Sequence, residues 1–256
     1  MNASSFVISD EMTDIMEQVK RIAPRETTIL LTGETGTGKT QLARLIHQLS
    51  GRRAEPFLVV DCGALSATLI ESEMFGHQKG AFTGASCNRA GKFAAVGRGT
   101  LFLDEVNSLS PQLQGKLLRA LDERVFEPLG SNKTRAVKAR IIAAANVPLE
   151  QAVQEGEFRQ DLYYRLNVVS FNLAPLRERP GLIQLLANQM LVEFAARSHR
   201  IIRGITTEAM QVLLEYPWPG NIRELRNIME RAVLFATGPY IQKCDVEELA
   251  LSLALR

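Results

Sequence analysis

The residues with the clearest chemistry form a glycine-rich stretch near the start of the chain, residues 33–40, with the pattern G-x-x-x-x-G-K-T. Glycines let the backbone turn tightly with its amide groups pointing inward, and such amides can hold a phosphate. Lys39 supplies a cation for the outer phosphates, and Thr40 offers a hydroxyl to Mg²⁺. A glycine-rich surface turn would not need Lys39. The stretch therefore predicts a nucleotide site made of Gly33, Glu34, Thr35, Gly36, Thr37, Gly38, Lys39 and Thr40.

Two carboxylates, Asp104 and Glu105, follow a short apolar run at residues 100–103. In open parallel sheets, ligands bind at the carboxyl ends of the strands. Asp104 can hold Mg²⁺ there, and Glu105 can polarise an attacking water for phosphoryl transfer. Taken alone, the two acids fit a solvated loop equally well. Together with the phosphate-binding pattern they predict a site for a nucleotide and Mg²⁺, with Thr40 and Asp104 at the metal.

The elements that must position these groups alternate between strand and helix. A buried strand is expected just before the phosphate-binding stretch and a helix just after it, and Ser110 followed by Pro111 predicts another helix start, with Ser110 as its cap. Alternation of this kind predicts an α/β fold with a parallel sheet and right-handed crossovers. The expected strands are residues 27–31, 57–60, 100–105, 139–146 and 168–172, and the expected helices are 9–23, 41–47, 70–75, one after 110 and parts of 149–166.

From residue 176 onward the pattern changes to helix after helix. Two prolines and a glycine at residues 217–220 force a turn between two of these helices. The chain is therefore expected to divide into a nucleotide-binding α/β part, residues 1–175, and a small all-α part, residues 176–256. The expected helices of the second part are residues 182–196, 206–215, 221–236 and 246–255.

Composition is that of an ordinary globular protein of 256 residues, with 46% hydrophobic and 23% charged residues. No apolar run approaches the roughly 20 residues of a membrane span, and the start lacks a signal peptide, so we expect a cytoplasmic protein without a membrane partner. Cys62, Cys87 and Cys244 are odd in number and far apart, which argues against a disulfide framework or zinc cluster. The net charge of +2 does not by itself call for nucleic acid.

Five segments carry the motifs of one family: G-E-T-G-T-G-K-T at residues 33–40, E-M-F-G-H at 73–77, G-A-F-T-G-A at 80–85, T-L-F-L-D-E at 100–105 and W-P-G-N-I-R-E-L at 218–225. Together they resemble the central AAA+ domain of NtrC-type bacterial enhancer-binding proteins, which activate RNA polymerase carrying sigma-54. The likeness covers nearly the whole chain, and G-A-F-T-G-A is its most specific part. It implies an AAA+ fold with a helical lid and an ATPase that remodels the closed promoter complex.

The resemblance also assigns roles at the nucleotide. It implies that Asp104 serves Mg²⁺, that Glu105 orients the attacking water, and that Asn146 and Arg223 are the first and second sensors of nucleotide state. The plain alternative for Arg223 is a surface helix residue, which the preceding Trp-Pro-Gly-Asn makes less attractive.

The family assembles as a ring, usually of six subunits, in which arginines from one subunit complete the site of its neighbour. The matching residues are Arg159 and Arg165. A guanidinium supplied in this way can neutralise the charge that spreads over the phosphoryl oxygens. Two arginines on a helical stretch would otherwise be a solvated face. The sequence leaves open whether the ring has six or seven members.

The G-A-F-T-G-A segment is implied to contact the sigma-54 RNA polymerase holoenzyme when ATP is bound or hydrolysed. Its glycines suit a mobile hairpin, and an exposed Phe82 would need a partner to cover it, whereas a Phe buried in its own loop is the plain alternative. A second loop, residues 127–138, is expected to support the first. The implied partner-binding residues are Gly80, Ala81, Phe82, Thr83, Gly84 and Ala85.

The sequence departs from the family pattern at a few positions. Asp61 stands where an Asn often bonds the glutamate that matches Glu105, and an Asp there would repel that glutamate unless a proton, water or cation intervenes. Ala145 replaces a common Thr of the first sensor, Gln78 a frequent Glu, and residues 181–182 a more acidic pair. None of these changes removes a catalytic group.

No receiver or helix-turn-helix module accompanies these motifs. We therefore expect an excised central domain, with DNA reached only through a helix-turn-helix domain absent from this chain or borrowed from another protein. Two alternatives stay open. One is a different AAA+ machine, such as a DNA-branch motor or metal-insertion chaperone, which has no need of residues 80–85. The other is a nucleotide-gated adaptor without turnover, against which Glu105 argues.

Overall fold

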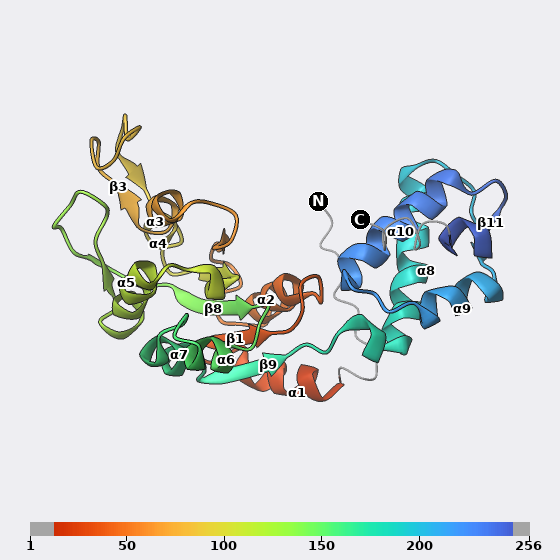
Figure 1. Cartoon of the computed structure of the whole chain (residues 1–256), viewed down its shortest axis with the longest axis horizontal. Coiled ribbons are helices and arrows are strands. Elements are labelled where there is room, and N and C mark those ends of the chain that lie inside the picture. The colour runs from red at the N-terminus through yellow and green to blue at the C-terminus, as the bar shows by residue number, and fades with distance from the viewer. Residues whose placement is uncertain (1–12, 248–256) are drawn as a thin grey trace. The chain divides into compact units, whose positions relative to one another are not determined.

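The computed structural model describes residues 13–247, which fall into two compact units (Figure 1). The sheet unit contains Glu17–Gly33 and Lys39–Leu173. Among the described residues, the lid unit contains 13–16, Glu34–Gly38 and 174–247. Most of the glycine-rich stretch thus groups with the lid, while its two ends, Gly33 and Lys39, belong to the sheet unit.

The sheet unit is built on five parallel strands in the order β2-β5-β8-β1-β9. Figure 1 shows β1 between β8 and β9, and Ile29 of β1 lies in register with Ile142 and Val169. The predicted parallel sheet is therefore confirmed. Its strands are β1 Ile29–Thr32, β2 Phe57–Asp61, β5 Thr100–Asp104, β8 Arg140–Ala145 and β9 Val169–Asn172.

Helices separate these strands, as the alternation predicts. Pro111 is the first residue of its helix and Ser110 occupies the cap position, as predicted, although the Ser110 side chain makes no hydrogen bond to the helix. The predicted opening helix at residues 9–23 is described only from Thr13. The helices are α1 Thr13–Ile22, α2 Lys39–Gln48, α3 Ala67–Phe75, α4 Lys92–Ala95, α5 Pro111–Asp122, α6 Leu149–Gln154 and α7 Gln160–Leu166, with a 3₁₀ turn at Val106–Ser108.

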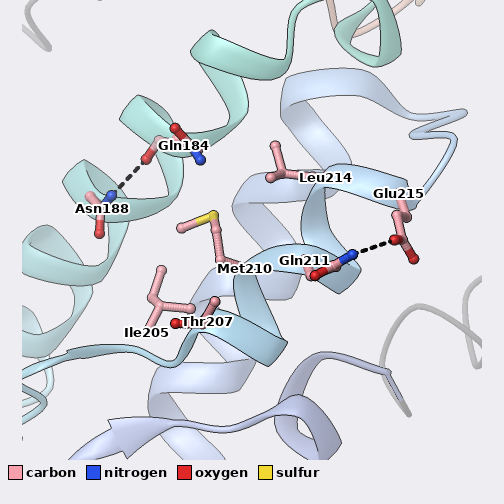
Figure 2. Close-up of a pocket in the computed structure, with 8 residues that line it drawn as sticks. All are labelled: Gln184, Asn188, Ile205, Thr207, Met210, Gln211, Leu214 and Glu215. Atoms are coloured by element: carbon pink, nitrogen blue, oxygen red, sulfur yellow. Dashed lines mark hydrogen bonds between the residues drawn. The ribbon is translucent and has the colours of Figure 1, made fainter.

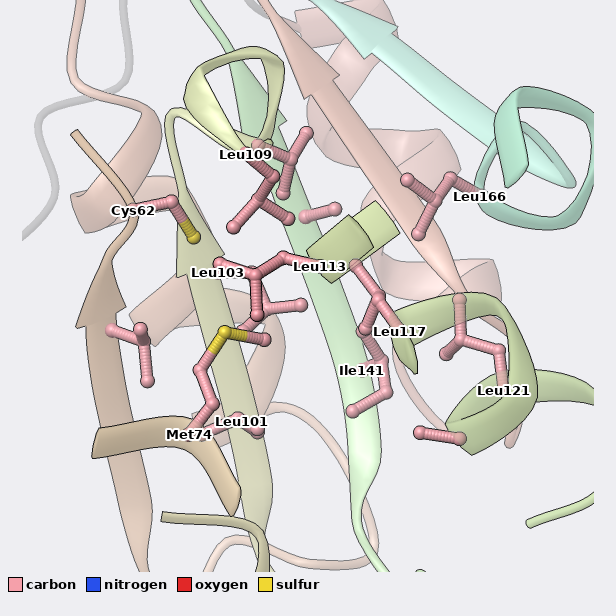
Figure 3. Packing of buried hydrophobic residues seen from close by; sticks show 14 of the residues in the cluster. Cys62, Met74, Leu101, Leu103, Leu109, Leu113, Leu117, Leu121, Ile141 and Leu166 are labelled. Carbon is pink, nitrogen blue, oxygen red and sulfur yellow. The ribbon is translucent and has the colours of Figure 1, made fainter. Parts of the chain in front are cut away.

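The core of the sheet unit lies between the sheet and α3 and α5 (Figure 3). Leu103 of β5, Ile141 of β8 and Leu117 of α5 belong to one cluster of buried side chains there, and all three are almost fully buried. Burying one leucine contributes about 1.5–3 kcal/mol, so this packing fixes the strand ends that carry the polar groups. Cys62 belongs to the same core, and all three cysteines are free thiols.

The sheet unit also contains two antiparallel hairpins. The first carries the G-A-F-T-G-A segment, for which the sequence predicts a hairpin, and the second was expected only as a supporting loop. The first pairs β3 Gly76–His77 with β4 Arg89–Ala90, and the second pairs β6 Val125–Phe126 with β7 Arg135–Ala136. Figure 1 shows the first hairpin projecting beside α3 and α4. Strands of two residues are too short to show an alternating pattern, so the sequence carries no signal for them.

The lid unit is mainly helical and packs around the fully buried Trp218. The predicted helices at residues 182–196, 206–215 and 221–236 are confirmed, and the first begins earlier, at Pro180. The fourth, at 246–255, lies mostly outside the described residues. The elements are a 3₁₀ turn at Leu176–Glu178, α8 Pro180–Arg197, α9 Thr207–Glu215, α10 Asn221–Phe235, and the parallel pair β10 Gly204–Ile205 and β11 Tyr240–Ile241.

Across residues 13–247, none of the helices combines the length and the apolar character that crossing a membrane would require.

Candidate nucleotide site

The sheet-unit ends of the glycine-rich stretch fold as a phosphate-binding loop requires. Gly33 follows β1 with φ 138°, and a Cβ there would come within 2.5 Å of the Leu173 carbonyl oxygen, so only glycine fits. Lys39 is the first residue of α2, and its Nζ donates to the Gly33 carbonyl at 2.6 Å. The predicted cation is thus buried at the N-terminus of a helix, where the helix dipole also favours an anion.

Thr40 and Asp104 lie together, as predicted for a Mg²⁺ site. The Thr40 hydroxyl donates to Asp104 Oδ2 at 3.3 Å, and the Glu105 amide donates to Asp104 Oδ1 at 3.1 Å. Burial raises the pKa of the Asp104 carboxyl above its ordinary value, although Lys39 and Thr40 oppose this shift. No group of three or more His, Cys, Asp or Glu residues among 13–247 forms a metal cage. One hydroxyl and one carboxylate suit Mg²⁺, which usually keeps waters and substrate phosphates as its other ligands.

Glu105 occupies a strained backbone position at the end of β5. Its φ is 54°, in the left-handed region that residues with a Cβ rarely adopt. Asn146 Nδ2 donates to Glu105 Oε1 at 3.4 Å. A Cβ on Gly63 would lie 2.4 Å from Glu105 Oε2, so the carboxylate lies directly over this glycine. The structure therefore brings together the predicted water-orienting acid and the predicted first sensor, and adds Gly63, which sequence reasoning missed.

Asp61 contacts its own turn. Its Oδ1 accepts a hydrogen bond from the Gly63 amide at 3.0 Å, and the residue is exposed at the end of β2. Among the described residues it makes no hydrogen bond to Glu105, so the position that is often Asn in the family does not hold the glutamate here. Asn146 makes that contact instead. Ala145, the other departure beside the site, is buried in β8 opposite Thr32 of β1.

Each of the two arginines predicted to act in trans forms an ion pair with a carboxylate of its own chain. Arg159, at the start of α7, pairs with Asp161 at 2.7 Å, and this bond raises the pKa of the guanidinium. Arg165 pairs with Asp122 at 2.8 Å and donates to the Leu121 carbonyl at 3.0 Å. Both side chains are nearly half exposed. Within the described part of the chain, neither arginine bonds to Asp104 or Glu105. The arrangement seen here therefore does not show either arginine acting at a nucleotide.

Within the lid unit, the middle of the glycine-rich stretch lies against the start of α10. The Ile222 amide donates to the Gly36 carbonyl at 3.0 Å. Gly36 has φ 83°, and a Cβ there would lie 2.4 Å from the Gly220 carbonyl oxygen and 3.3 Å from Arg223 Cβ. The Cβ atom of Arg223, the predicted second sensor, therefore lies directly beside the loop. Asn221, which the sequence reasoning did not single out, donates a hydrogen bond to the same loop.

The G-A-F-T-G-A segment forms the turn of the first hairpin. The Gly80 amide donates to the Ala85 carbonyl at 2.9 Å, and the Ala85 amide to the Phe82 carbonyl at 3.0 Å. Thr83 is exposed, but Phe82 is half-buried and lies edge-on to His77, with ring centroids 5.0 Å apart. The expected exposed Phe is therefore partly covered within its own hairpin.

The second loop, residues 127–138, contacts the first as expected. The Gln78 amide donates to the Leu129 carbonyl, and the Leu129 amide to the Gly76 carbonyl, each at 2.9 Å. Gly130 has φ 72°, and a Cβ there would lie 2.9 Å from Ala81 Cβ. The two loops therefore form one projecting body, in which the second supports the base of the first.

A separate hollow of about 480 Å³ lies between α8 and α9 of the lid unit (Figure 2). Its polar side chains bond within their own helices, Asn188 to the Gln184 carbonyl and Gln211 to Glu215, each at 2.9 Å. None of its residues belongs to the predicted nucleotide site. The hollow therefore adds no group to that site.

Comparison with known proteins agrees with this geometry. The sigma-54 interaction domain matches residues 6–172, and the AAA+ ATPase lid domain matches residues 177–252. The chain belongs to the sigma-54 interaction domain family, and it carries the AAA+ fold of sigma-54-dependent transcriptional activators.

The relatives include the transcriptional regulatory protein ZraR of Escherichia coli K12, which is 47% identical over 246 residues, covering 96% of this chain and 55% of ZraR. The DNA-binding transcriptional activator HyfR of the same strain is 50% identical over 230 residues, covering 90% of this chain and 34% of HyfR. The chain thus spans about half the length of ZraR and a third of HyfR.

Among solved structures, NtrX from Brucella abortus in complex with ATP matches with a TM-score of 0.88 and 32% identity, covering 98% of this chain and 58% of NtrX. NtrX in complex with ADP matches with a TM-score of 0.86, covering 94% of this chain and 54% of NtrX. The family, the fold and its nucleotide-bound neighbours therefore all support the predicted AAA+ assignment.

Proposed function

We propose that this chain is a Mg²⁺-dependent ATPase that assembles as a ring, hexameric by preference, and uses ATP hydrolysis to remodel the closed promoter complex of sigma-54 RNA polymerase. The observation that carries the proposal is the linked set of Thr40, Asp104, Glu105 and Asn146 at the carboxyl edge of the sheet. Lys39, the first residue of α2, donates to the Gly33 carbonyl just after β1, at the same edge. The projecting hairpin with the G-A-F-T-G-A turn supplies the partner-binding part.

The roles of the residues follow from their chemistry. The loop amides and Lys39 would bind the phosphates, and Thr40 and Asp104 would hold Mg²⁺, which would supply positive charge beside the phosphate oxygens. Glu105 accepts a proton from the attacking water, and Asn146 orients the Glu105 carboxylate. ATP and Mg²⁺ are therefore the cofactors of the proposal.

The partners in the proposal are the sigma-54 holoenzyme and further copies of this chain. Gly80–Ala85 is the proposed contact with the sigma factor, because the hairpin presents Thr83 to solvent. DNA would be reached through a helix-turn-helix domain on another part of the protein or on another protein. Such a partner places the protein in the cytoplasm, where the polymerase acts.

The first test is the dependence of ATP turnover on protein concentration. With Mg²⁺ present, turnover per subunit is expected to rise with concentration, because assembly completes each site with a neighbour's arginines. Lys39→Ala should show no turnover at any concentration, since its phosphate-binding cation is lost. Wild-type chain that binds ATP without any turnover would instead favour a nucleotide-gated adaptor.

A second test addresses the boundary between subunits. Arg159→Ala and Arg165→Ala should each bind ATP almost normally yet hydrolyse it poorly, because their own phosphate-binding loop is intact. Mixing Arg165→Ala with Lys39→Ala subunits should restore part of the turnover, since some interfaces then pair an intact loop with an intact arginine. Mixed rings without any gain over the separate variants would rule out action in trans.

A further inference from the structure

The turn that precedes α10 in the lid unit, residues 218–221, is held in place by several hydrogen bonds. Trp218 and Asn221 both have positive φ, 50° and 52°, and both are fully buried. Trp218 Nε1 donates to the Leu213 carbonyl at 2.8 Å, and the Asn221 amide donates to the Trp218 carbonyl at 2.9 Å. The Gly220 amide donates to the Glu224 carboxylate at 2.8 Å. A turn bonded at each of these points holds the Asn221 side chain in one place.

The Asn221 amide group joins two segments of the lid unit that are far apart in sequence. Its Nδ2 donates to Glu34 Oε2 and to the Thr35 carbonyl, both at 3.0 Å. Its Oδ1 accepts from the Leu176 amide at 2.7 Å. Because the side chain is fully buried, losing any of these bonds would leave a buried polar group unsatisfied, which costs more than an exposed bond is worth. Asn221 therefore fixes the start of the glycine-rich stretch.

Arg177 holds the same carboxylate from the other side. Its two terminal nitrogens donate to the two oxygens of Glu34, at 2.7 and 3.1 Å, in the forked geometry that suits a guanidinium and a carboxylate. The Arg177 and Asn221 bonds lower the pKa of Glu34, which therefore stays ionised. An ionised carboxylate within a phosphate-binding loop would repel the phosphates of a nucleotide unless a cation offsets its charge.

We propose that Arg177 and Asn221 are positioning residues of the nucleotide site: they hold and neutralise Glu34, so that residues of the lid set nucleotide affinity through the loop. The inference rests on the proposed nucleotide binding. The proposal goes beyond nucleotide binding because neither Arg177 nor Asn221 needs to touch the nucleotide. The lid acts here through the neutralised Glu34 rather than through Arg223.

The test measures the affinity of the full 256-residue chain for a fluorescent ADP analogue. Arg177→Ala should weaken binding about tenfold, because it leaves one partly screened negative charge beside the phosphates. Adding Glu34→Gln to that variant should restore affinity, since the repelling charge is then gone. Glu34→Gln alone gives the affinity that the double variant should reach. If the ion pair had only a structural role, removing the Glu34 charge as well would not restore the affinity.

Asn221→Asp tests the second positioning residue with almost no change in shape. The new carboxylate keeps an acceptor for the Leu176 amide but sets a negative charge against Glu34, so binding should weaken at least about tenfold. Glu34→Gln should rescue this variant in part, because the side-chain amide that it introduces can donate to the new carboxylate, whereas the hydrogen bond from residue 221 to the Thr35 carbonyl is still lost. Asn221→Gly keeps the positive φ while removing the side-chain amide, and its affinity should fall without rescue by Glu34→Gln.

Arg226→Ala is the matched control. Arg226 forms the same kind of forked pair, with Glu193 in the lid unit, at nearly the same exposure, and the described residues give it no contact with the loop. Thermal unfolding of each variant checks that the fold is kept. Equal affinity for Arg177→Ala and Arg226→Ala, or failure of Glu34→Gln to rescue Arg177→Ala, would overturn the inference while leaving nucleotide binding intact. Failure of the wild-type chain to bind the analogue would overturn the proposed function as well.

Discussion

Glu105→Gln is expected to bind ATP like the wild-type chain and to hydrolyse it about 10²–10⁴-fold more slowly, the usual loss when a general base is removed. Gln has the same shape, and its side-chain oxygen can still accept the hydrogen bond from Asn146. It cannot take a proton from the attacking water. Phosphate release measures turnover, and the fluorescent ADP analogue measures binding.

The control for this variant is Glu123→Gln, another Glu-to-Gln change. Glu123 is an exposed acid that pairs with Arg119 at 2.8 Å and has no described contact with the nucleotide site. Its turnover should equal that of the wild type, because only a local surface ion pair is lost. Near-normal turnover in Glu105→Gln would show that another group activates the water, and Asp61, at the end of the adjacent strand, would be the first residue to examine.

Much of the sheet was predictable because its strands are continuous apolar runs. Residues 139–146 are apolar in nearly every position, as expected for a strand covered on both faces, and β8 is buried throughout. The glycines of residues 80–85 indicated a hairpin, but the strand bounds of the two hairpins were not predictable, because each strand has only two residues. The contact between His77 and Leu129 was not predictable either, because it joins segments far apart in sequence. Local pattern cannot report a contact of that separation.

The features of the candidate site also divide into those that the sequence predicts and those that it does not. Lys39, Thr40 and Asp104 were predictable because a motif fixes their spacing, and the structure brings them to one edge of the sheet. The left-handed backbone of Glu105 and the contact between Asn221 and Glu34 depend on tertiary packing. The Trp-Pro-Gly-Asn turn was the available signal for Asn221, since a residue that tolerates positive φ stood next to a forced turn.

The second large effect is expected at Thr83. Thr83→Ala should abolish activation of a sigma-54 promoter while ATP turnover continues, because Thr83 is exposed on a hairpin that shares no described hydrogen bond with the nucleotide site. A loop that meets its partner in only one nucleotide state converts hydrolysis into a change of affinity, and removing the contact uncouples the two. An in vitro transcription assay measures the output, and phosphate release serves as its internal control.

The matched control for this change lies elsewhere on the projecting body. Thr134 is an exposed threonine of the second loop whose hydroxyl donates to Glu127 at 3.3 Å. Thr134→Ala makes the same chemical change without touching the G-A-F-T-G-A turn, so promoter activation should be kept. Equal losses in both variants would mean that the supporting loop, and not Thr83 itself, determines the output.

Capture of sigma-54 in a trapped nucleotide state tests the central claim most directly. The wild-type chain, incubated with ADP and a metal fluoride that imitates the transferring phosphoryl group, should form a stable complex with isolated sigma-54 on a native gel. Thr83→Ala should form none under the same conditions. If trapped wild-type rings leave sigma-54 unbound, the activator function is wrong and a different AAA+ machine takes its place.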